Sequence, residues 1–367
     1  NEILRKYAPS NFFEEWLNHP QFDEYWERLS PNLEGVDLPM LHIGGWFDPY
    51  LRGTLHLYKT MRDRNSPQSL IIGPWAHLPW GRKTGEIDCG AAANSPVDEL
   101  QVRWCDLFLK GIDTEILEEP AVRLFEMGSD RWRSFEEFPE NTPQVYYLAT
   151  NGLAGMRDDA GQLIASNVEL VPNLSSESED VFVRDPWRPV PSLGGHASSP
   201  AGRFDRSALD CRTDILTYTS EPLLEDLYLA GEGLVEIYCQ TDAPSFDLCA
   251  VLSEVRAATR VPSEAASQHP AGSQGGVYNF TQGYIRIDSN CEFVQIPLQV
   301  TCMYVARGNR LRLSLSADCF PAYSLNLGTG DCARSMRSIE ANILAIAVKS
   351  GTNFASKIFL PIVEPPE

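Results

Sequence analysis

The chain has 367 residues, of which 43% are hydrophobic and 22% are charged, and its formal net charge is −20 at pH 7. The length is sufficient for more than one hydrophobic core, and the composition is that of an ordinary globular protein. Nucleic acids and anionic membranes are held by clustered Lys and Arg, so the acidic excess argues against both as partners.

The nine cysteines give no sign of a metal site or of a disulfide framework. No two of them form a Cys-x-x-Cys pair, and an odd number cannot all pair within one chain. No apolar run approaches the ~20 residues of a membrane-spanning helix. We therefore expect reduced cysteines, a cytoplasmic protein, no metal ion and no cofactor. The chain begins at Asn1 without a methionine, which leaves export as an open alternative.

Residues 1–35 are expected to form two short amphipathic helices. Aromatic and aliphatic side chains recur on one face of each helix, and we expect most of them to pack against other parts of the protein. These side chains are Phe12, Phe13, Trp16 and Leu17 in the first helix and Phe22, Tyr25, Trp26 and Leu29 in the second.

Residues 38–77 contain two short apolar runs separated by a helical pattern. Residues 40–43 and 70–72 are almost continuously apolar, as parallel strands covered on both faces are. Between them, residues 49–62 repeat apolar side chains at steps of three and four, and Pro49 suits the first turn of a helix. We therefore predict a strand, a crossover helix and a second, parallel strand.

An acid and a histidine follow these two strands. Asp48 comes after the first strand and His77 after the second, and ligands of open parallel sheets gather beyond the carboxyl ends of the strands. A triad in an α/β hydrolase has the chain order serine, acid, histidine. We therefore predict that Asp48 and His77 are catalytic. The alternatives are an N-cap role for Asp48 and an ordinary loop position for His77; His42, within the first strand, is expected to be a core residue.

The serine of such a triad is expected outside the chain. A Gly-x-Ser-x-Gly motif occurs nowhere in the 367 residues. The nearest sequence, Ala271-Gly272-Ser273-Gln274-Gly275, follows the histidine and has no strand before it, so we interpret it as a loop. We expect a fragment or a processed piece that is inactive by itself.

After the second strand, the sequence pattern predicts first a helix and then many short strands. Residues 97–110 predict a helix that ends at Gly111. From residue 119 onward, short β-rich runs alternate with turn residues, which is typical of an antiparallel sandwich. These runs include residues 122–125, 145–148, 234–238 and 311–315. We predict three regions, residues 1–35, 36–118 and 119–367.

Several motifs occur in order along nearly the whole chain. They are Gly44-Gly45-Trp46-Phe47-Asp48, Arg52-Gly53-Thr54-Leu55, Ile72-Gly73-Pro74-Trp75-Ala76-His77, Arg103-Trp104 with Phe108-Leu109-Lys110-Gly111-Ile112-Asp113, residues 122–132, residues 185–195, residues 216–223 and Arg310-Leu311-Arg312-Leu313-Ser314. In these motifs the chain resembles the cocaine esterase and X-prolyl dipeptidyl-peptidase-like serine hydrolases, the CocE/NonD family.

The resemblance implies a fold of α/β plus all-β class. Residues 1–35 would be the end of a helical cap, residues 36–118 the C-terminal part of an α/β-hydrolase domain, and residues 119–367 a jelly-roll β-sandwich. It also implies that Tyr50 lines the substrate pocket, with Trp46 and Trp75 as further pocket walls or core residues.

The expected function is hydrolysis of a small ester, an amide or a short peptide, the last after an X-Pro dipeptide, through a Ser-Asp-His triad. His77 would accept the serine proton and Asp48 would orient the imidazole. A homo-oligomer remains open. The alternative is a non-catalytic β-sandwich interaction module attached to a hydrolase relic, in which Asp48 and His77 have lost their roles.

Overall fold

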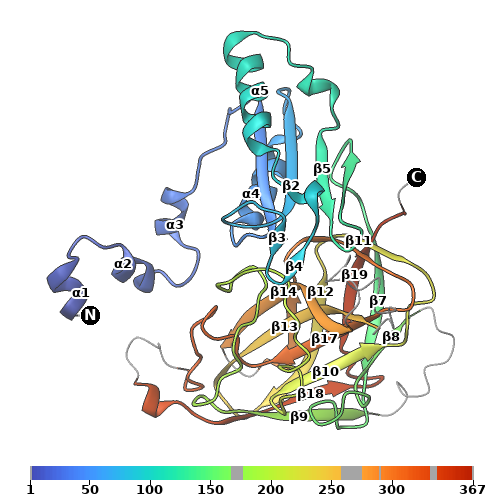
Figure 1. The fold of residues 1–367 in the computed structure, drawn as a ribbon. Coiled ribbons are helices and arrows are strands. Elements are labelled where there is room, and N and C mark those ends of the chain that lie inside the picture. Colours follow the sequence, from blue (N-terminus) through green and yellow to red (C-terminus); the bar gives the residue numbers. More distant parts are fainter. Residues whose placement is uncertain (1, 167–176, 258–274, 289–290, 331–336, 366–367) are drawn as a thin grey trace.

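The computed structural model describes residues 2–166, 177–257, 275–288, 291–330 and 337–365. Two bodies lie one above the other in Figure 1, and three short helices extend to one side of them. The upper body holds a four-stranded sheet and the lower body a 13-stranded sheet. Residues 271–274 of the Gly-Ser-rich loop lie outside the described residues.

The upper sheet has the strand order β1-β2-β5-β6. Its strands are β1 (Met40–Phe47), β2 (Gln68–Ala76), β5 (Val122–Glu126) and β6 (Arg131–Phe135). β2 lies parallel to both β1 and β5, whereas β6 is antiparallel to β5. The predicted strand, crossover helix and parallel strand are therefore confirmed.

Helices cover the two faces of this sheet, as expected for parallel strands. α4 (Leu51–Met61) buries Leu51 and Leu55 in one hydrophobic cluster with Ile72 of β2. α5 (Val97–Lys110) buries Leu100 in a second cluster with Ile71, whose side chain points to the opposite face. α5 ends at Gly111, which has the left-handed φ of +71° that favours glycine at a helix end.

The pairing of β1 with β2 contains an irregularity just before the strands end. Gly45 pairs with Gly73, but Phe47 pairs with Ala76, so β2 has one more residue than β1 in this stretch. Such a bulge interrupts the ladder, which accounts for Pro74 within a central strand. Between β2 and α5 lie β3 (Lys83–Thr84), β4 (Ile87–Asp88) and the 3-10 helix η1 (Ala91–Ala93); η2 (Ile116–Glu118) follows α5.

One strand lies in a different sheet from the one that the sequence indicates. The run 122–125 was expected in the antiparallel part, but Val122 and Leu124 pair in parallel with Leu70 and Ile72 of β2. A short apolar run between turn residues has the same pattern in either sheet, and only the tertiary partner distinguishes them. By strand pairing, the upper sheet therefore extends past residue 118 to Phe135.

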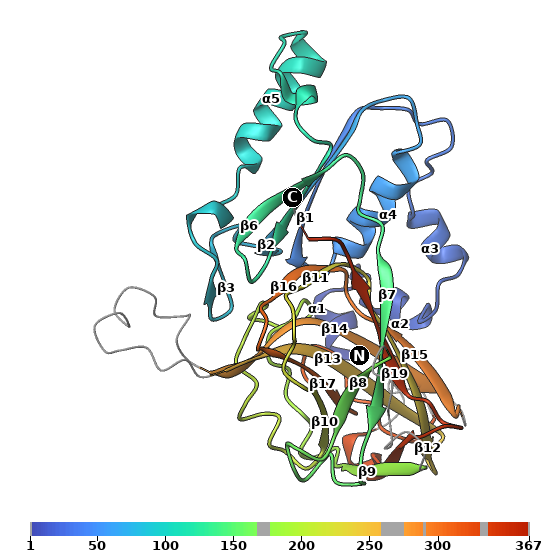
Figure 2. The ribbon, with the colours of Figure 1, turned by 90° about the vertical axis from the view of Figure 1, so that its right-hand side faces the viewer.

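The lower sheet is antiparallel except for one parallel pair, β8 with β10. The predicted runs 145–148, 234–238 and 311–315 lie in β7, β12 and β17. Figure 2 shows how the strands of this body lie beneath the upper sheet. Its strands are β7 (Thr142–Ala149), β8 (Gln162–Ala165), β9 (Ser178–Arg184), β10 (Ile215–Ser220), β11 (Leu227–Gly231), β12 (Leu234–Thr241), β13 (Ser245–Arg256), β14 (Gly276–Asp288), β15 (Phe293–Pro297), β16 (Thr301–Val305), β17 (Arg310–Ser316), β18 (Leu344–Ser350) and β19 (Lys357–Ile362), with the 3-10 helix η4 (Ser338–Glu340) before β18.

A single hydrophobic cluster joins the two bodies. It contains Trp46 and Leu55 of the upper body together with Val235 and Leu313 of the lower sheet. An isolated bridge between Met127 and Met303 also connects the two bodies. The two bodies therefore share one hydrophobic cluster, beside the separate cluster of the upper body around Ile71 and Leu100.

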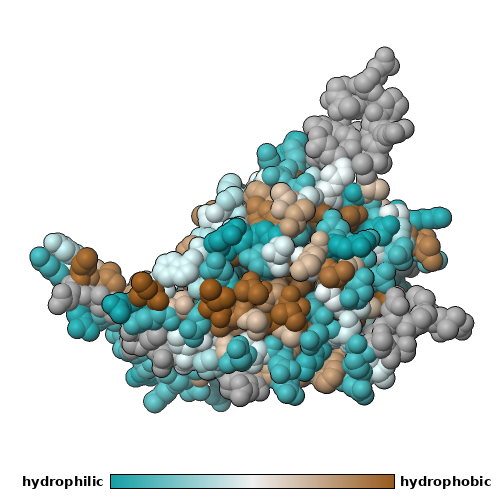
Figure 3. Space-filling view, turned by 90° about the horizontal axis from the view of Figure 1, so that it is seen from below, coloured by the Kyte–Doolittle hydropathy of each residue, from teal (hydrophilic) through white to brown (hydrophobic). Residues whose placement is uncertain are grey.

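The N-terminal residues form three short helices, α1 (Glu2–Tyr7), α2 (Phe13–Asn18) and α3 (Glu24–Leu29), where the sequence indicates two. The expected packing against other parts of the chain is not seen. Phe12 is 56% exposed and Phe22 is 71% exposed, and the rings of Phe12 and Trp16 contact each other at 4.3 Å between centroids. Brown, apolar side chains are visible on this arm in Figure 3. Within the described residues, no helix has both the length and the apolar character needed to cross a membrane.

Glycine at position 45 is required by a close backbone approach. A Cβ there would lie 2.2 Å from the Trp75 carbonyl oxygen and 2.7 Å from its carbonyl carbon. Gly45→Ala should therefore destabilise the protein by about 1–3 kcal/mol or more, because backbone cannot move aside as a side chain end can. The midpoint of thermal unfolding measures the change.

Gly53 provides the matched control. It lies on the exposed side of α4, and a Cβ there would meet nothing within 4 Å. Gly53→Ala should raise stability by about 0.5–1 kcal/mol through helix propensity alone. Equal effects of the two substitutions would contradict the packing argument.

Candidate active site

Asp48 and His77 are side by side because of the strand register. Phe47 and Ala76 form the last pair between β1 and β2, and Asp48 and His77 are the residues that directly follow the two strands. Asp48 Oδ2 lies 3.2 Å from His77 Nδ1. The Asp48 side chain is 12% exposed and the His77 side chain 59% exposed, so the carboxylate is sheltered and the imidazole faces outward.

The rest of Asp48 is fixed by its chain neighbours. Its Oδ1 accepts the Tyr50 N–H at 2.8 Å, and its own N–H donates to the Gly45 carbonyl at 3.0 Å. The two carboxylate oxygens therefore have separate partners, one at the start of α4 and one on His77. Capping of the helix start and pairing with histidine are compatible functions of this side chain.

The three predicted aromatic pocket residues have different surroundings. The Tyr50 ring is 66% exposed and meets the His77 ring edge to face at 5.1 Å. Trp46 is 1% exposed and donates its indole N–H to the Phe125 carbonyl at 2.7 Å, and Trp75 is fully buried and donates to the Ala93 carbonyl at 2.7 Å. Packing accounts for both tryptophans, and only Tyr50 lies openly beside the imidazole.

The loop that carries His77 is held at both ends. Trp80 Nε1 donates to the His77 carbonyl at 2.8 Å, and Thr84 Oγ1 donates to the Pro74 carbonyl at 2.5 Å. The β3–β4 hairpin then contacts the lower body, where Gly85 bridges to Arg203. His77 is thus presented by a loop with fixed ends.

The lower body also contacts Asp48, and no sequence pattern predicts this contact. Gln299, between β15 and β16, donates its Nε2 to the backbone carbonyl of Asp48 at 3.1 Å. Arg52 at the start of α4 donates to the carbonyls of Pro297 and Leu298 at 3.2 and 3.3 Å. No local motif marks Gln299, because the contact joins residues 251 positions apart.

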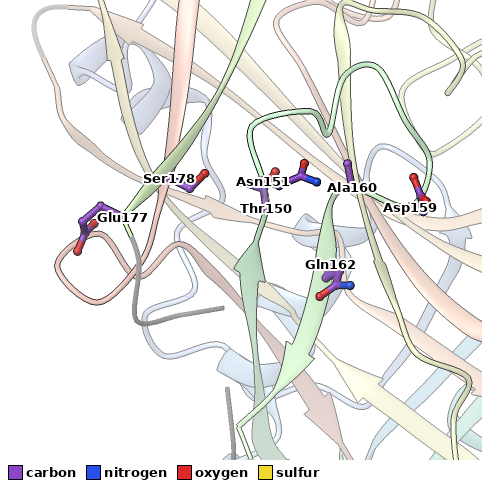
Figure 4. Close-up of a pocket in the computed structure, with 7 residues that line it drawn as sticks. All are labelled: Thr150, Asn151, Asp159, Ala160, Gln162, Glu177 and Ser178. Carbon is purple, nitrogen blue, oxygen red and sulfur yellow. The ribbon is translucent and has the colours of Figure 1, made fainter. Parts of the chain in front are cut away.

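A separate hollow of about 420 Å³ opens among the ends of β7, β8 and β9, and Figure 4 shows the residues around it. Its two carboxylates already have partners, since Asp159 accepts from Arg157 and Glu177 accepts from Asn353. The hollow includes neither Asp48 nor His77. The lining residues are Thr150, Asn151, Asp159, Ala160, Gln162, Glu177 and Ser178.

The arrangement at Asp48 and His77 suits proton transfer. Because Nδ1 of the imidazole faces the carboxylate, Nε2 is the nitrogen that can accept and return a proton. Among the residues that the structure describes, no three His, Cys, Asp or Glu side chains gather as a metal site would require.

Comparison with solved structures defines the class of fold. An aminopeptidase from a marine sediment archaeon, Thaumarchaeota archaeon, superposes with a TM-score of 0.78 at 19% identity, covering 99% of this chain and 61% of that one. An α-amino acid ester hydrolase superposes with a TM-score of 0.75 at 19% identity, covering 97% of this chain and 61% of that one. Over nearly its whole length, the chain thus shares the fold of the matched part of these two proteins.

Sequence comparison defines the family. Residues 1–79 match the family model of the X-Pro dipeptidyl-peptidase (S15 family), and residues 115–353 match that of the X-Pro dipeptidyl-peptidase C-terminal non-catalytic domain. The cocaine esterase of Rhodococcus sp. (strain MB1 Bresler) is 27% identical over 360 residues, which are 95% of this chain and 61% of that protein. The chain belongs to the X-Pro dipeptidyl-peptidase and cocaine esterase family, as the sequence motifs predict. It spans less than two thirds of the length of these relatives.

His196, which is largely buried and lies close to Arg52, should make the stability of the protein depend on pH. Its Nε2 is 3.4 Å from the Tyr323 hydroxyl. Burial, and secondly the nearby Arg52 charge, lower the pKa of His196 from 6.5 to about 4. Between these pH values the unfolded chain binds the proton and the folded chain does not, so stability should fall as the pH drops from 6.5 towards 4, by up to about 1.4 kcal/mol per pH unit.

His196→Gln should remove this contribution. The free energy of unfolding of the wild type, measured with urea, should fall more steeply than that of the variant between pH 7 and pH 5, and His56→Gln, which replaces an exposed histidine, is the control. Parallel pH dependences of wild type and His196→Gln would show that His196 does not make this contribution.

Proposed function

We propose that Asp48 and His77 are the acid and the base of a Ser-Asp-His triad in the complete protein, which hydrolyses an ester or an amide. The observation that supports this most directly is their pairing at 3.2 Å beyond the last paired residues of two adjacent parallel strands. The serine is supplied by a segment outside the 367 residues, since no Gly-x-Ser-x-Gly occurs within them.

In this proposal the reaction proceeds through an acyl-enzyme. The serine hydroxyl attacks the acyl carbonyl as Nε2 of His77 takes its proton, and the same proton then passes to the leaving alcohol or amine. Water attacks the acyl-enzyme with the same proton transfers and releases the acid. Asp48, sheltered and held by the Tyr50 N–H, keeps the imidazole oriented and stabilises its positive charge.

The substrate is a small ester, an amide or a short peptide. The sequence relative is an esterase, and the two structural neighbours are an aminopeptidase and an amino acid ester hydrolase, so proteins that share this fold act on both bond types. Tyr50 lines the pocket in this proposal, because its exposed ring lies against the imidazole edge. In the complete protein, the helices α1, α2 and α3, whose aromatic side chains are exposed or half-buried here, form part of the helical cap.

We also infer the finer architecture of the rest of the chain. Residues 36–118, continued by β5 and β6, are the closing part of an α/β-hydrolase sheet. The 13-stranded, mostly antiparallel sheet is a β-sandwich of jelly-roll type, which fits the alternating burial of strands such as β9.

Variants of the triad members in the complete protein test the catalytic role. His77→Ala and Asp48→Asn should each lower kcat by on the order of a thousandfold while the protein stays folded. Asparagine keeps the oxygen that accepts the Tyr50 N–H, and the His77 side chain is largely exposed, so neither change removes a core contact. Turnover of p-nitrophenyl esters, with circular dichroism for the fold, measures the effect.

His42→Gln is the matched control. His42 is 4% exposed and its Nε2 lies 2.9 Å from Gln68 Oε1, so its loss should change stability more than turnover. Full activity of both triad variants would refute the assignment. A complete protein that neither hydrolyses esters nor reacts with a fluorophosphonate would favour the alternative of a non-catalytic interaction module.

A further inference from the structure

Apart from its pairing with His77, Asp48 has one hydrogen bond that comes from outside its own strand and helix. Residues 45–51 provide the hydrogen-bond partners of the Asp48 N–H and of its Oδ1. The Asp48 carbonyl oxygen accepts one hydrogen bond from the same segment, from the Leu51 N–H at 3.2 Å. The second bond to that carbonyl comes from Gln299 of the lower body at 3.1 Å. Gln299 is 2% exposed, so this contact is shielded from water.

The segment that carries Gln299 is held in place by hydrogen bonds of its backbone. The Gln299 N–H donates to the Gln282 carbonyl at 2.9 Å, and the Gln299 carbonyl accepts the Thr281 hydroxyl at 2.5 Å. The preceding Leu298 N–H donates to the Gly233 carbonyl at 2.8 Å. Gln299 therefore extends from a backbone bonded to two other parts of the lower body, and it can act as a fixed point for the acid.

A second link holds the same segment against α4. Arg52, four residues after Asp48, donates to the carbonyls of Pro297 and Leu298 and forms an ion pair with Glu232 at 3.1 Å. The residues just before Gln299 thus bind the start of the helix that follows the acid. The contact between Gln299 and Asp48 belongs to a continuous junction rather than to one isolated hydrogen bond.

Stability alone does not account for an amide at position 299. The side-chain Oε1 of Gln299 is buried and has no hydrogen-bond partner among the described residues. A buried polar atom without a partner costs about 1–3 kcal/mol, and the Asp48 carbonyl would keep the Leu51 N–H if Gln299 were apolar. An unbranched apolar side chain would fill the same volume without that cost.

We propose that Gln299 is a positioning residue for the acid of the triad, an inference that rests on the proposed function. The bond fixes the carbonyl of the peptide between Asp48 and Pro49. If this peptide rotated, the backbone at Asp48 would change its orientation, and the side chain would move its Oδ2 away from the imidazole of His77. The part of the chain that matches a family model named as a non-catalytic domain would then contribute directly to the geometry of the site.

The test uses the complete enzyme with Gln299→Met and Gln299→Leu. Both variants remove the amide N–H and the unpaired oxygen together, so the midpoint of thermal unfolding should stay near that of the wild type. We expect kcat to fall about tenfold to a hundredfold, with KM within twofold, because small displacements of a catalytic group cost rate rather than ground-state binding. The low-field proton NMR signal of the His77 Nδ1–H should weaken, because its partner is less well held.

Gln295→Leu is the matched control. Gln295 lies on β15 in the same stretch, is exposed, and donates to Glu236 without contacting Asp48. This variant should keep the wild-type kcat and the low-field signal. It separates the loss of the Asp48 contact from the general effect of replacing glutamine by leucine.

Several outcomes would overturn the proposal. Wild-type kcat in both Gln299 variants, or a change in KM alone, would show that Gln299 does not position the acid. A lower kcat with an unchanged low-field signal would also contradict the proposal. Loss of folding in both variants would make Gln299 a structural residue. The proposed function fails separately, if His77→Ala and Asp48→Asn keep full activity.

Discussion

The register of β1 against β2 is the constraint on which the candidate site depends. Two adjacent parallel strands end at the same level only if their pairing is fixed, and a shift of one residue would turn a side chain to the other face. Here the extra residue of β2 between Gly73 and Ala76 brings the strand ends into line. Without that bulge the residue after Phe47 would not be opposite the residue after Ala76. The bulge in β2 therefore places Asp48 and His77 opposite each other.

Burial and close backbone contact keep this register. Gly45 allows the backbone at Trp75 to approach, and the Trp75 ring fills the α5 side of the sheet. On the other side, α4 belongs to the hydrophobic cluster that continues into the lower sheet. Gly128, at a φ of +91°, approaches the Tyr304 carbonyl next to the bridge between Met127 and Met303 that joins the two bodies. The site thus lies on a sheet that is supported from both faces.

Sequence alone predicts the local parts of this arrangement and fails where distant segments meet. The apolar runs, the 3.6-residue period of α4 and the end of α5 at Gly111 are local patterns, and each was predicted. The run 122–125, which forms β5, was predicted to lie in the antiparallel part but pairs in parallel with β2, because an apolar run does not reveal which strand it pairs with. The aromatic side chains of α2 were expected to be packed, yet only the tertiary structure shows them exposed. Gln299 could not be found, because nothing near it in sequence indicates Asp48.

The junction formed by residues 297–299 limits how freely the two bodies can be recombined. Consider a chimaera that joins this upper sheet to the β-rich part of a relative. At the positions equivalent to residues 297–299, the relative would have to provide backbone carbonyls that accept from Arg52 and a side-chain amide that donates to the Asp48 carbonyl. It would also need to restore the apolar side chains of the shared cluster. The two bodies are therefore not interchangeable modules. A chimaera should take the residues around Asp48 and the segment between β15 and β16 from the same parent protein.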